Sequence, residues 1–277
     1  MKIIDGKTLA ENLRKNIANE VKQYSRPPGL AVVLVGDDEA SQVYVRNKSR
    51  ACVEVGFYSD QIHKSANITE EELLSEVNRL NENKTIDGIL VQLPLPEHID
   101  SNKIIEAIIP EKDVDGFSSE NVGKLSQNKS FISPCTPKGV MKMLASIKCD
   151  LRGKDCVIIG ASNIVGRPMA MEFLNAGATV QVCHKETKDI KQKAKSADII
   201  VAAAGVANLV NSEWVKEGAV IIDVGINRLE DGTMTGDVDF EDVKDMVSAI
   251  SPVPGGVGPM TIAVLLENTL TAYQAKL

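Results

Sequence analysis

The chain has 277 residues, of which 43% are hydrophobic and 25% are charged, with a formal net charge of -7 at pH 7. Its length allows two domains that each bury a core, and its composition is ordinary for a globular protein. No apolar run is long enough to span a bilayer, and the N-terminus lacks the apolar core of a signal peptide. Non-specific nucleic-acid binding usually needs a basic face, which this acidic balance does not favour. We therefore expect a cytoplasmic protein that binds neither membranes nor nucleic acid.

The five cysteines and three histidines do not form a metal-binding pattern. The cysteines are scattered and odd in number, with no close CxxC pair, and no two histidines lie at a ligand-like spacing. This usage is typical of reduced thiols in the cytosol and predicts no metal site.

The first part of the chain alternates apolar runs with amphipathic stretches. Thr69 and Glu72 form a capping box that predicts the start of a helix. The apolar residues from Gly88 onward are consecutive, which is typical of a strand covered on both faces. The other expected elements are helices over 9–21 and 41–55 and strands over 30–35 and 88–93. Such an alternation predicts a mostly parallel sheet.

A second alternation begins after Lys154 and predicts a doubly wound, Rossmann-type domain. The expected strands cover 156–159, 179–183, 198–203 and 220–224, and the expected helices cover 164–176 and 189–196. Apolar residues at helical spacing over 261–273 predict a last helix that packs back on the first domain.

The fold class expected from this order is α/β, with an N-terminal substrate domain and a dinucleotide-binding domain. A polar stretch near 116–138 has few apolar runs and marks the boundary. The predicted substrate domain comprises 1–118 and 261–277, the junction 119–138, and the dinucleotide-binding domain 139–260.

A glycine-containing loop follows the first strand of the second domain. Gly160 would allow the tight turn and Gly166 the close packing of helix on strand. Backbone N–H groups at that helix start would face a pyrophosphate, where the helix dipole also favours negative charge. The pattern G-x-S-x-x-x-G also suits a plain strand–turn–helix junction, but the strand before it favours a nucleotide site.

The residues after the next strand bear on which dinucleotide binds. An acidic side chain there suits the ribose hydroxyls of NAD, and a basic one suits the extra phosphate of NADP. Lys185 and Glu186 are neighbours with opposite implications, and His184 could equally be a solvated strand end. The segment favours NADP and leaves NAD possible.

Ser41, Tyr44 and Lys48 recur at spacings of three and four and therefore share one helix face. On a partly apolar face, desolvation would lower the pKa of the lysine and make its neutral amine available as a proton carrier. Alternatively, the Lys48 stem lies along the apolar surface with its ammonium in water.

Two further segments place polar groups where α/β folds bind ligands. Gln92 lies at the carboxyl end of a predicted buried strand. Asp113 and Asp115 lie in a turn-prone loop. Each signal has a plainer explanation, a strand cap for Gln92 and an Asx turn for the aspartates, but their combination points to a site.

With these residues, the whole chain resembles the bifunctional methylenetetrahydrofolate dehydrogenase/methenyltetrahydrofolate cyclohydrolases. The motifs that carry the resemblance are Ala40-Ser41-x-x-Tyr44-Val45-x-x-Lys48, Val91-Gln92-Leu93-Pro94-Leu95-Pro96, Lys112-Asp113-Val114-Asp115-Gly116, Pro134-Cys135-Thr136-Pro137-Lys138-Gly139, Gly160-x-Ser162-x-Ile164-Val165-Gly166-x-Pro168, Asp223-Val224-Gly225-Ile226-Asn227 and Pro252-Val253-Pro254-Gly255-Gly256-Val257-Gly258-Pro259-Met260-Thr261.

The resemblance implies that a tetrahydrofolate derivative binds in the cleft between the domains. It gives Tyr44 a stacking role, Lys48 the role of catalytic lysine, Gln92 that of its hydrogen-bonding partner, and Asp115 that of pterin anchor. Oxidation of 5,10-methylenetetrahydrofolate with NADP would be followed by hydrolysis of the methenyl product to 10-formyltetrahydrofolate. A homodimer is expected from the same resemblance.

Backbone at Pro254, Gly255 and Gly256 is expected to approach the substrate closely, and Thr261 is expected to cap the last helix. Many relatives carry arginine after the first glycine of the phosphate loop, where this chain has alanine, which weakens the argument for NADP. The expected cofactor-binding residues are Gly160, Ala161, Ser162, Ile164, Gly166, His184, Lys185 and Ile226.

Three other functions compete with this interpretation. A dehydrogenase without the hydrolytic step would not need Lys48 with Gln92. A non-catalytic dinucleotide sensor would need neither these residues nor Asp115. A two-domain dehydrogenase for another small substrate would bind NADP but no folate.

Overall fold

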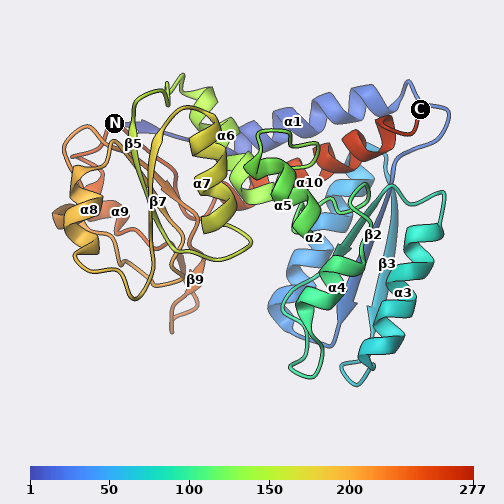
Figure 1. The fold of residues 1–277 in the computed structure, drawn as a ribbon. Coiled ribbons are helices and arrows are strands. Elements are labelled where there is room, and N and C mark those ends of the chain that lie inside the picture. The colour runs from blue at the N-terminus through green and yellow to red at the C-terminus, as the bar shows by residue number, and fades with distance from the viewer. The chain divides into compact units, whose positions relative to one another are not determined.

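The computed structural model describes residues 1–277, which form two compact units. Unit 1 comprises Met1–Ala10 and Thr136–Thr261, and unit 2 comprises Glu11–Cys135 and Ile262–Leu277. Each unit contains one parallel sheet covered by helices (Figure 1). The first ten residues, expected in the substrate domain, group with unit 1 because strand β1 pairs with strand β11 of that unit. None of the helices is long and apolar enough to cross a membrane.

Unit 2 is built on a three-stranded parallel sheet with the order β3-β2-β4. Its central strand is buried at every position, because its sequence GLAVVLV supplies apolar side chains to both faces. The strands are β2 (Gly29–Val35), β3 (Tyr58–Lys64) and β4 (Gly88–Val91). The helices are α1 (Gly6–Val21, which begins in unit 1), α2 (Glu39–Val55), α3 (Glu70–Glu82), α4 (Ser101–Ala107) and α5 (Ser119–Ser126).

The two faces of this sheet have different covers. Ala31, Val33 and Val35 point to one face and pack with the apolar residues of α3 and α4. The alternate residues of β2 face α2, which lies on the other side (Figure 1). The capping box predicted at Thr69 is present at the start of α3, where the Thr69 side chain accepts from the Glu72 N–H.

Unit 1 is built on a six-stranded sheet with the order β1-β11-β8-β7-β5-β6, and all its pairs are parallel. An apolar core of buried residues from β5, β7, β8 and the neighbouring helices covers it. The strands are β1 (Lys2–Ile3), β5 (Asp155–Ile159), β6 (Thr179–Cys183), β7 (Ile199–Ala202), β8 (Val220–Asp223) and β11 (Ala249–Ile250). A small hairpin joins β9 (Asn227–Arg228) and β10 (Met234–Thr235).

The helices of unit 1 are α6 (Cys135–Ser146), α7 (Gly166–Asn175), α8 (Ile190–Ser196), the 3-10 turn η1 (Ser212–Trp214) and α9 (Phe240–Val243). The last helix, α10 (Val257–Gln274), starts in unit 1 and continues into unit 2. The expected α/β class, the Rossmann-type unit and the return of the C-terminal helix to the first domain are confirmed. In unit 2, the buried Asn268 side chain of α10 donates to the carbonyl of Val114 at 2.9 Å.

The expected cap at Thr261 is wrong. Helix α10 begins four residues earlier, at Val257, so Thr261 lies within its first turns. The Thr261 hydroxyl donates to the Val257 carbonyl at 3.3 Å instead of accepting from a free N–H. A threonine inside a helix commonly makes this bond to the carbonyl one turn back.

Candidate functional site

The strand order of unit 2 creates one position where a ligand would be expected. From the central strand β2 the chain runs first to β3 on one side and then to β4 on the other. In open α/β sheets, ligands bind outside the carboxyl ends of the strands, where the order reverses. Helix α2 follows the carboxyl end of β2, and Gln92 follows that of β4. Residues from these two segments therefore meet at the reversal.

Lys48 and Gln92 form a hydrogen bond there, as predicted. The Lys48 Nζ donates to Gln92 Oε1 at 2.9 Å. The Gln92 amide has a fixed orientation, because its Nε2 donates to the carbonyl of Leu93 at 2.7 Å. Its backbone N–H also donates to the Val33 carbonyl in the sheet at 2.8 Å. The half-buried amine is thus held by an acceptor that carries no charge.

Tyr44 lies one helical turn before Lys48. On their shared face Ser41, Cys52 and Val55 are buried, whereas the Tyr44 side chain remains 39% exposed. Burial of the rest of the ring raises the pKa of Tyr44 above its ordinary value. The ring therefore offers an accessible aromatic face near the lysine.

Asp115 lies in the loop that runs beside β4. The Ile89 N–H of that strand donates to the Lys112 carbonyl at 2.8 Å, and Ile89 also forms a parallel bridge with Asp113. Burial raises the pKa of Asp115, and the nearby positive charge of Lys48 opposes that shift. The structure thus brings Lys48, Gln92 and Asp115 together around one edge of the sheet.

The two aspartates of the loop have different hydrogen-bond partners, which their spacing alone did not predict. The buried Asp113 carboxylate accepts from the N–H groups of residues 116, 117 and 118 at 3.1, 3.2 and 2.8 Å. It also accepts from Asn121 Nδ2 at 2.9 Å. Asp113 therefore makes the predicted Asx-type turn, whereas the Asp115 carboxyl accepts a hydrogen bond from the Cys135 thiol and lies near the charge of Lys48.

The glycine loop of unit 1 has the expected form. Strand β5 lies between β6 and β7, so the strand order reverses at its carboxyl end. Gly160 has φ +127°, and a Cβ there would lie 2.0 Å from the Ala203 carbonyl oxygen. A Cβ at Gly166 would lie 2.0 Å from the Gly160 carbonyl oxygen. Glycine is required at both positions, for the turn and for close packing of α7 on β5.

Other expected nucleotide residues lie around this loop. The Ser162 hydroxyl accepts from the Val165 N–H at 3.2 Å before α7 begins, and the Ile164 side chain is 39% exposed. The half-buried Ala161 accepts from Arg167 Nε at 3.2 Å through its carbonyl. Arg167 is thus a cation beside the loop, in addition to the residues predicted from the sequence.

The segment after β6 is exposed. The Lys185 side chain is 92% exposed and its Nζ lies 4.0 Å from the Glu186 carboxylate. The exposed His184 accepts from the Glu186 N–H through Nδ1 at 3.3 Å. At such exposure the ion pair contributes little, and the Lys185 ammonium is free to meet another anion.

The remaining predicted residues lie on the loops that follow β8 and β11 in unit 1. The Ile226 side chain, on the loop after β8, is 45% exposed. Gly255 has φ +100°, and its carbonyl accepts from the Lys7 N–H at 2.9 Å. A Cβ at Gly256 would lie 2.4 Å from the Pro252 carbonyl oxygen, and Pro254 is exposed. The glycines at 255 and 256 thus allow a backbone turn and a close backbone approach.

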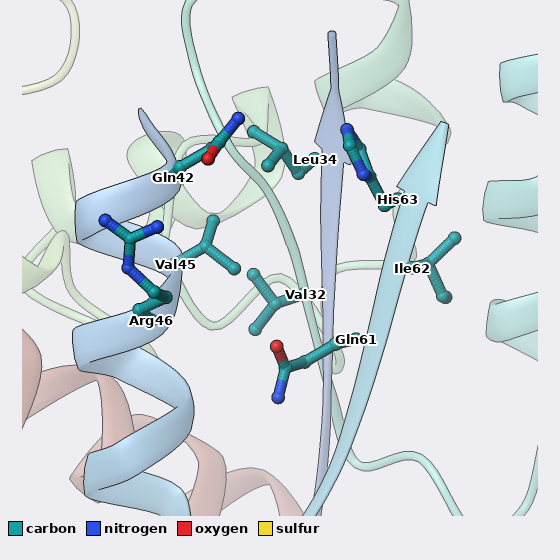
Figure 2. A pocket seen from close by; sticks show the side chains of 8 residues that line it. All are labelled: Val32, Leu34, Gln42, Val45, Arg46, Gln61, Ile62 and His63. Carbon is teal, nitrogen blue, oxygen red and sulfur yellow. The ribbon is translucent and has the colours of Figure 1, made fainter. Parts of the chain in front are cut away.

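A separate cavity of about 200 Å³ lies between α2 and strands β2 and β3 (Figure 2). The cavity lies toward β3, on one side of the central strand β2, whereas Gln92 follows β4 on the other side. None of the predicted site residues lines it. The lining side chains are those of Val32, Leu34, Gln42, Val45, Arg46, Gln61, Ile62 and His63.

Comparison with known proteins agrees with the predicted resemblance. The model of the tetrahydrofolate dehydrogenase/cyclohydrolase catalytic domain matches residues 4–115. The model of the NAD(P)-binding domain of the same family matches residues 134–277. A curated relative, the bifunctional protein FolD of Ruthia magnifica subsp. Calyptogena magnifica, is 61% identical over 277 residues, which is 100% of both chains.

Solved structures give the same result. The bifunctional enzyme FolD, a methylenetetrahydrofolate dehydrogenase/cyclohydrolase from Campylobacter jejuni, is 53% identical, covers 100% of both chains and superposes with a TM-score of 0.98. The Trypanosoma brucei enzyme, solved with NADP and an inhibitor, is 40% identical over 99% of this chain and 97% of its own, with a TM-score of 0.95. Because both family models and full-length relatives match, the chain belongs to the tetrahydrofolate dehydrogenase/cyclohydrolase family.

Proposed function

We propose that this protein oxidises 5,10-methylenetetrahydrofolate to 5,10-methenyltetrahydrofolate with NADP and then hydrolyses the product to 10-formyltetrahydrofolate. The observation that carries the proposal is the hydrogen bond of 2.9 Å between Lys48 and Gln92. The charge of Lys48 also lowers the pKa of the nearby Asp115 carboxyl, against the effect of burial. Neither a sensor nor a dehydrogenase without hydrolysis needs this combination.

Lys48 acts in the hydrolytic step as a proton acceptor. A water oxygen bonds to the methenyl carbon and loses one proton, which gives a neutral hydroxyl adduct. The bond from that carbon to one ring nitrogen then breaks, the hydroxyl proton passes to the departing nitrogen, and the oxygen becomes the formyl carbonyl. The neutral amine of Lys48 can take the proton lost by the water, directly or through a second water. Gln92 directs the amine without adding a negative charge, which would favour the ammonium form.

Asp115 and Tyr44 bind the substrate. A pterin presents adjacent N–H donors, and a carboxylate can accept both in a fixed geometry. Burial raises the pKa of Asp115, so new donors would relieve part of the cost of its charge. The accessible Tyr44 ring supplies an aromatic surface for stacking.

Unit 1 has residues that fit a dinucleotide. The close-packed glycines at 160 and 166 let the loop turn into α7, whose N-terminus would face a pyrophosphate. Bound NADP would accept the hydride, and the protein would supply orientation. The exposed Lys185 supports NADP, although Ala161 brings no second cation, and NAD remains an alternative cofactor. The resemblance also supports a homodimer, which sedimentation would test.

The test compares wild type with Lys48→Met and a control, Lys84→Met, which changes an exposed lysine after α3. Each is assayed with methylenetetrahydrofolate and NADP, then NAD, for reduced cofactor and for methenyl and formyl products. We expect both activities in wild type and control, and formation of the formyl product to fall by about 10²–10⁴-fold in Lys48→Met, the usual contribution of a general base. Absence of reduced cofactor in wild type would refute the dehydrogenase, and undiminished formyl product in Lys48→Met would refute the role of the lysine.

A further inference from the structure

Two buried aspartates lie under the loops at the carboxyl edge of the unit 1 sheet. Asp223 ends β8 and is 3% exposed, and Asp237 follows β10 and is 0% exposed. Asp223 begins one of the motifs that carry the family resemblance, and Asp237 lies in none of them. Buried carboxylates are costly unless hydrogen bonds compensate them, so their partners indicate what they do.

The Asp237 carboxylate is surrounded by three consecutive backbone N–H groups. Its Oδ2 accepts from Ala204 at 2.6 Å and Gly205 at 2.9 Å, and its Oδ1 accepts from Val206 at 3.0 Å. Successive N–H groups that converge in this way form an anion-binding nest. Here the anion is a side chain of the same unit, more than thirty residues further along the chain. The loop after β7 is therefore held in one conformation.

The same carboxylate also reaches the loop after β8. Asn227 Nδ2 donates to Asp237 Oδ1 at 2.9 Å. One side chain thus connects two loops, and each loop carries an exposed apolar residue. These are Val206, with 51% of its side chain exposed, and Ile226, with 45%.

Asp223 in turn holds Asp237 in place. Its Oδ1 accepts from the Asp237 N–H at 3.0 Å and from the Gly225 N–H at 2.9 Å. A Cβ at Gly225 would lie 2.2 Å from Asp237 Oδ1, and a Cβ at Gly236 would lie 1.8 Å from Asp223 Oδ2. The carboxylates therefore fill spaces that only glycine leaves open.

These loops border the reversal of strand order in unit 1. Strand β7 lies beside β5. The Ala203 carbonyl, just after β7, packs so close to Gly160 of the glycine loop that a Cβ there would lie 2.0 Å from its oxygen. A dinucleotide at this reversal has its pyrophosphate on the glycine loop and its adenosine ribose near the end of β6. Its nicotinamide half then extends the other way, over the ends of β7 and β8.

We propose that Asp237 is a positioning residue of the dinucleotide site, which sets Val206 and Ile226 as an apolar pair against the nicotinamide half. This inference rests on the proposed function, since it requires a dinucleotide in unit 1. Asp237 touches no cofactor. It acts through the two loops, whose fixed separation orients the ring that accepts the hydride.

The test replaces Asp237 with Asn and compares the matched control Asp245→Asn, an exposed aspartate of the same unit. In Asp237→Asn, one carboxylate oxygen is replaced by an NH₂ group. This NH₂ group then faces backbone N–H groups, which need an acceptor. We expect the Kd and the KM for NADP to rise at least about tenfold, because hydrogen bonds to a charged acceptor are lost. Hydrolysis of methenyltetrahydrofolate supplied directly needs no hydride transfer and should stay within about twofold of wild type.

A second variant keeps the proposal testable if Asp237→Asn does not fold, as judged by its thermal unfolding. Asn227→Ala removes only the bond between the loops, and we expect a rise of about threefold to tenfold in the Kd for NADP. The proposal would be overturned if a folded Asp237→Asn bound NADP with an unchanged Kd. If Asp237→Asn does not fold, an unchanged Kd for NADP in Asn227→Ala would overturn it instead. Parallel loss of the hydrolytic activity would overturn it as well, because the residue would then be merely structural. Failure of wild type to bind NADP would instead refute the proposed function.

Discussion

Replacing Asp113 with Asn should weaken substrate binding without changing Asp115, the residue proposed to bind the pterin. Oδ1 of Asp113 accepts two backbone N–H groups, and Oδ2 accepts the Ser118 N–H and the Asn121 side chain. An amide keeps one of these acceptors and places an NH₂ group against the donors of the other. Hydrogen bonds to a charged group contribute about 1.5–3 kcal/mol each, so the loop should lose about 3 kcal/mol after relaxation.

Ordering the weakened loop when the substrate binds should cost about half of these 3 kcal/mol. The KM for methenyltetrahydrofolate should then rise about tenfold, since 1.4 kcal/mol is one factor of ten. The assay measures KM and kcat for hydrolysis, the Kd for NADP and the thermal midpoint. The control is Asp100→Asn, an exposed helix cap of the same unit where asparagine caps equally well. A lower thermal midpoint with an unchanged KM would show that the loop does not position Asp115, and the reasoning would fail.

Two further predictions concern stability and the glycine loop. Asp87→Ala leaves Arg26, Lys276 and a buried backbone N–H without their acceptor and should lower the free energy of unfolding by about 3 kcal/mol in urea titrations. Burial raises the pKa of Asp87, but the hydrogen bonds from these groups outweigh burial and hold the pKa below 3.8. The stability contributed by the Asp87 carboxylate is therefore complete above pH 3.8 and is lost as the pH falls through the lowered pKa. Wild type should lose more stability than the variant over that acid range, and equal slopes would contradict the sign. Gly160→Ala would put a Cβ 2.0 Å from the Ala203 carbonyl oxygen and should raise the Kd for NADP more than about tenfold, with hydrolysis retained as the control activity.

Elements with a clear local signal, such as a run of β-branched or apolar residues or a capping box, were predicted well from the sequence. Residues 30–35 and 179–183 lie in β2 and β6 with almost the same bounds, and the capping box at Thr69 opens α3. Strand β3 was not predicted, because its sequence YSDQIHK carries mostly polar side chains at the edge of a sheet. The start of α10 was placed too late because Val257-Gly258-Pro259 reads as a loop, although proline is tolerated in the first turn of a helix.

The candidate site was only partly accessible to the same reasoning. Lys48 and Gln92 are 44 residues apart, and only the succession of strand and helix suggested that they meet. Residues that act through backbone N–H groups leave no such signal, because any loop has these donors. For this reason the sequence pattern showed neither that Asp113 holds the loop around Asp115 nor that Asp237 holds the loop after β7.

The arrangement around Lys48 also bears on how one site could serve both binding and proton transfer. At an effective dielectric constant near 20, a carboxylate about 4 Å from an ammonium attracts it by about 4 kcal/mol. Gln92 adds no such attraction because its amide is neutral, whereas the charge of Lys48 does act on the Asp115 carboxyl. If the pterin donates its N–H groups to Asp115 as proposed, those donors take up part of its charge. Substrate binding would then weaken the attraction between Asp115 and Lys48, so the residue proposed to bind the pterin would also change the electrostatic surroundings of the residue proposed to take up the proton.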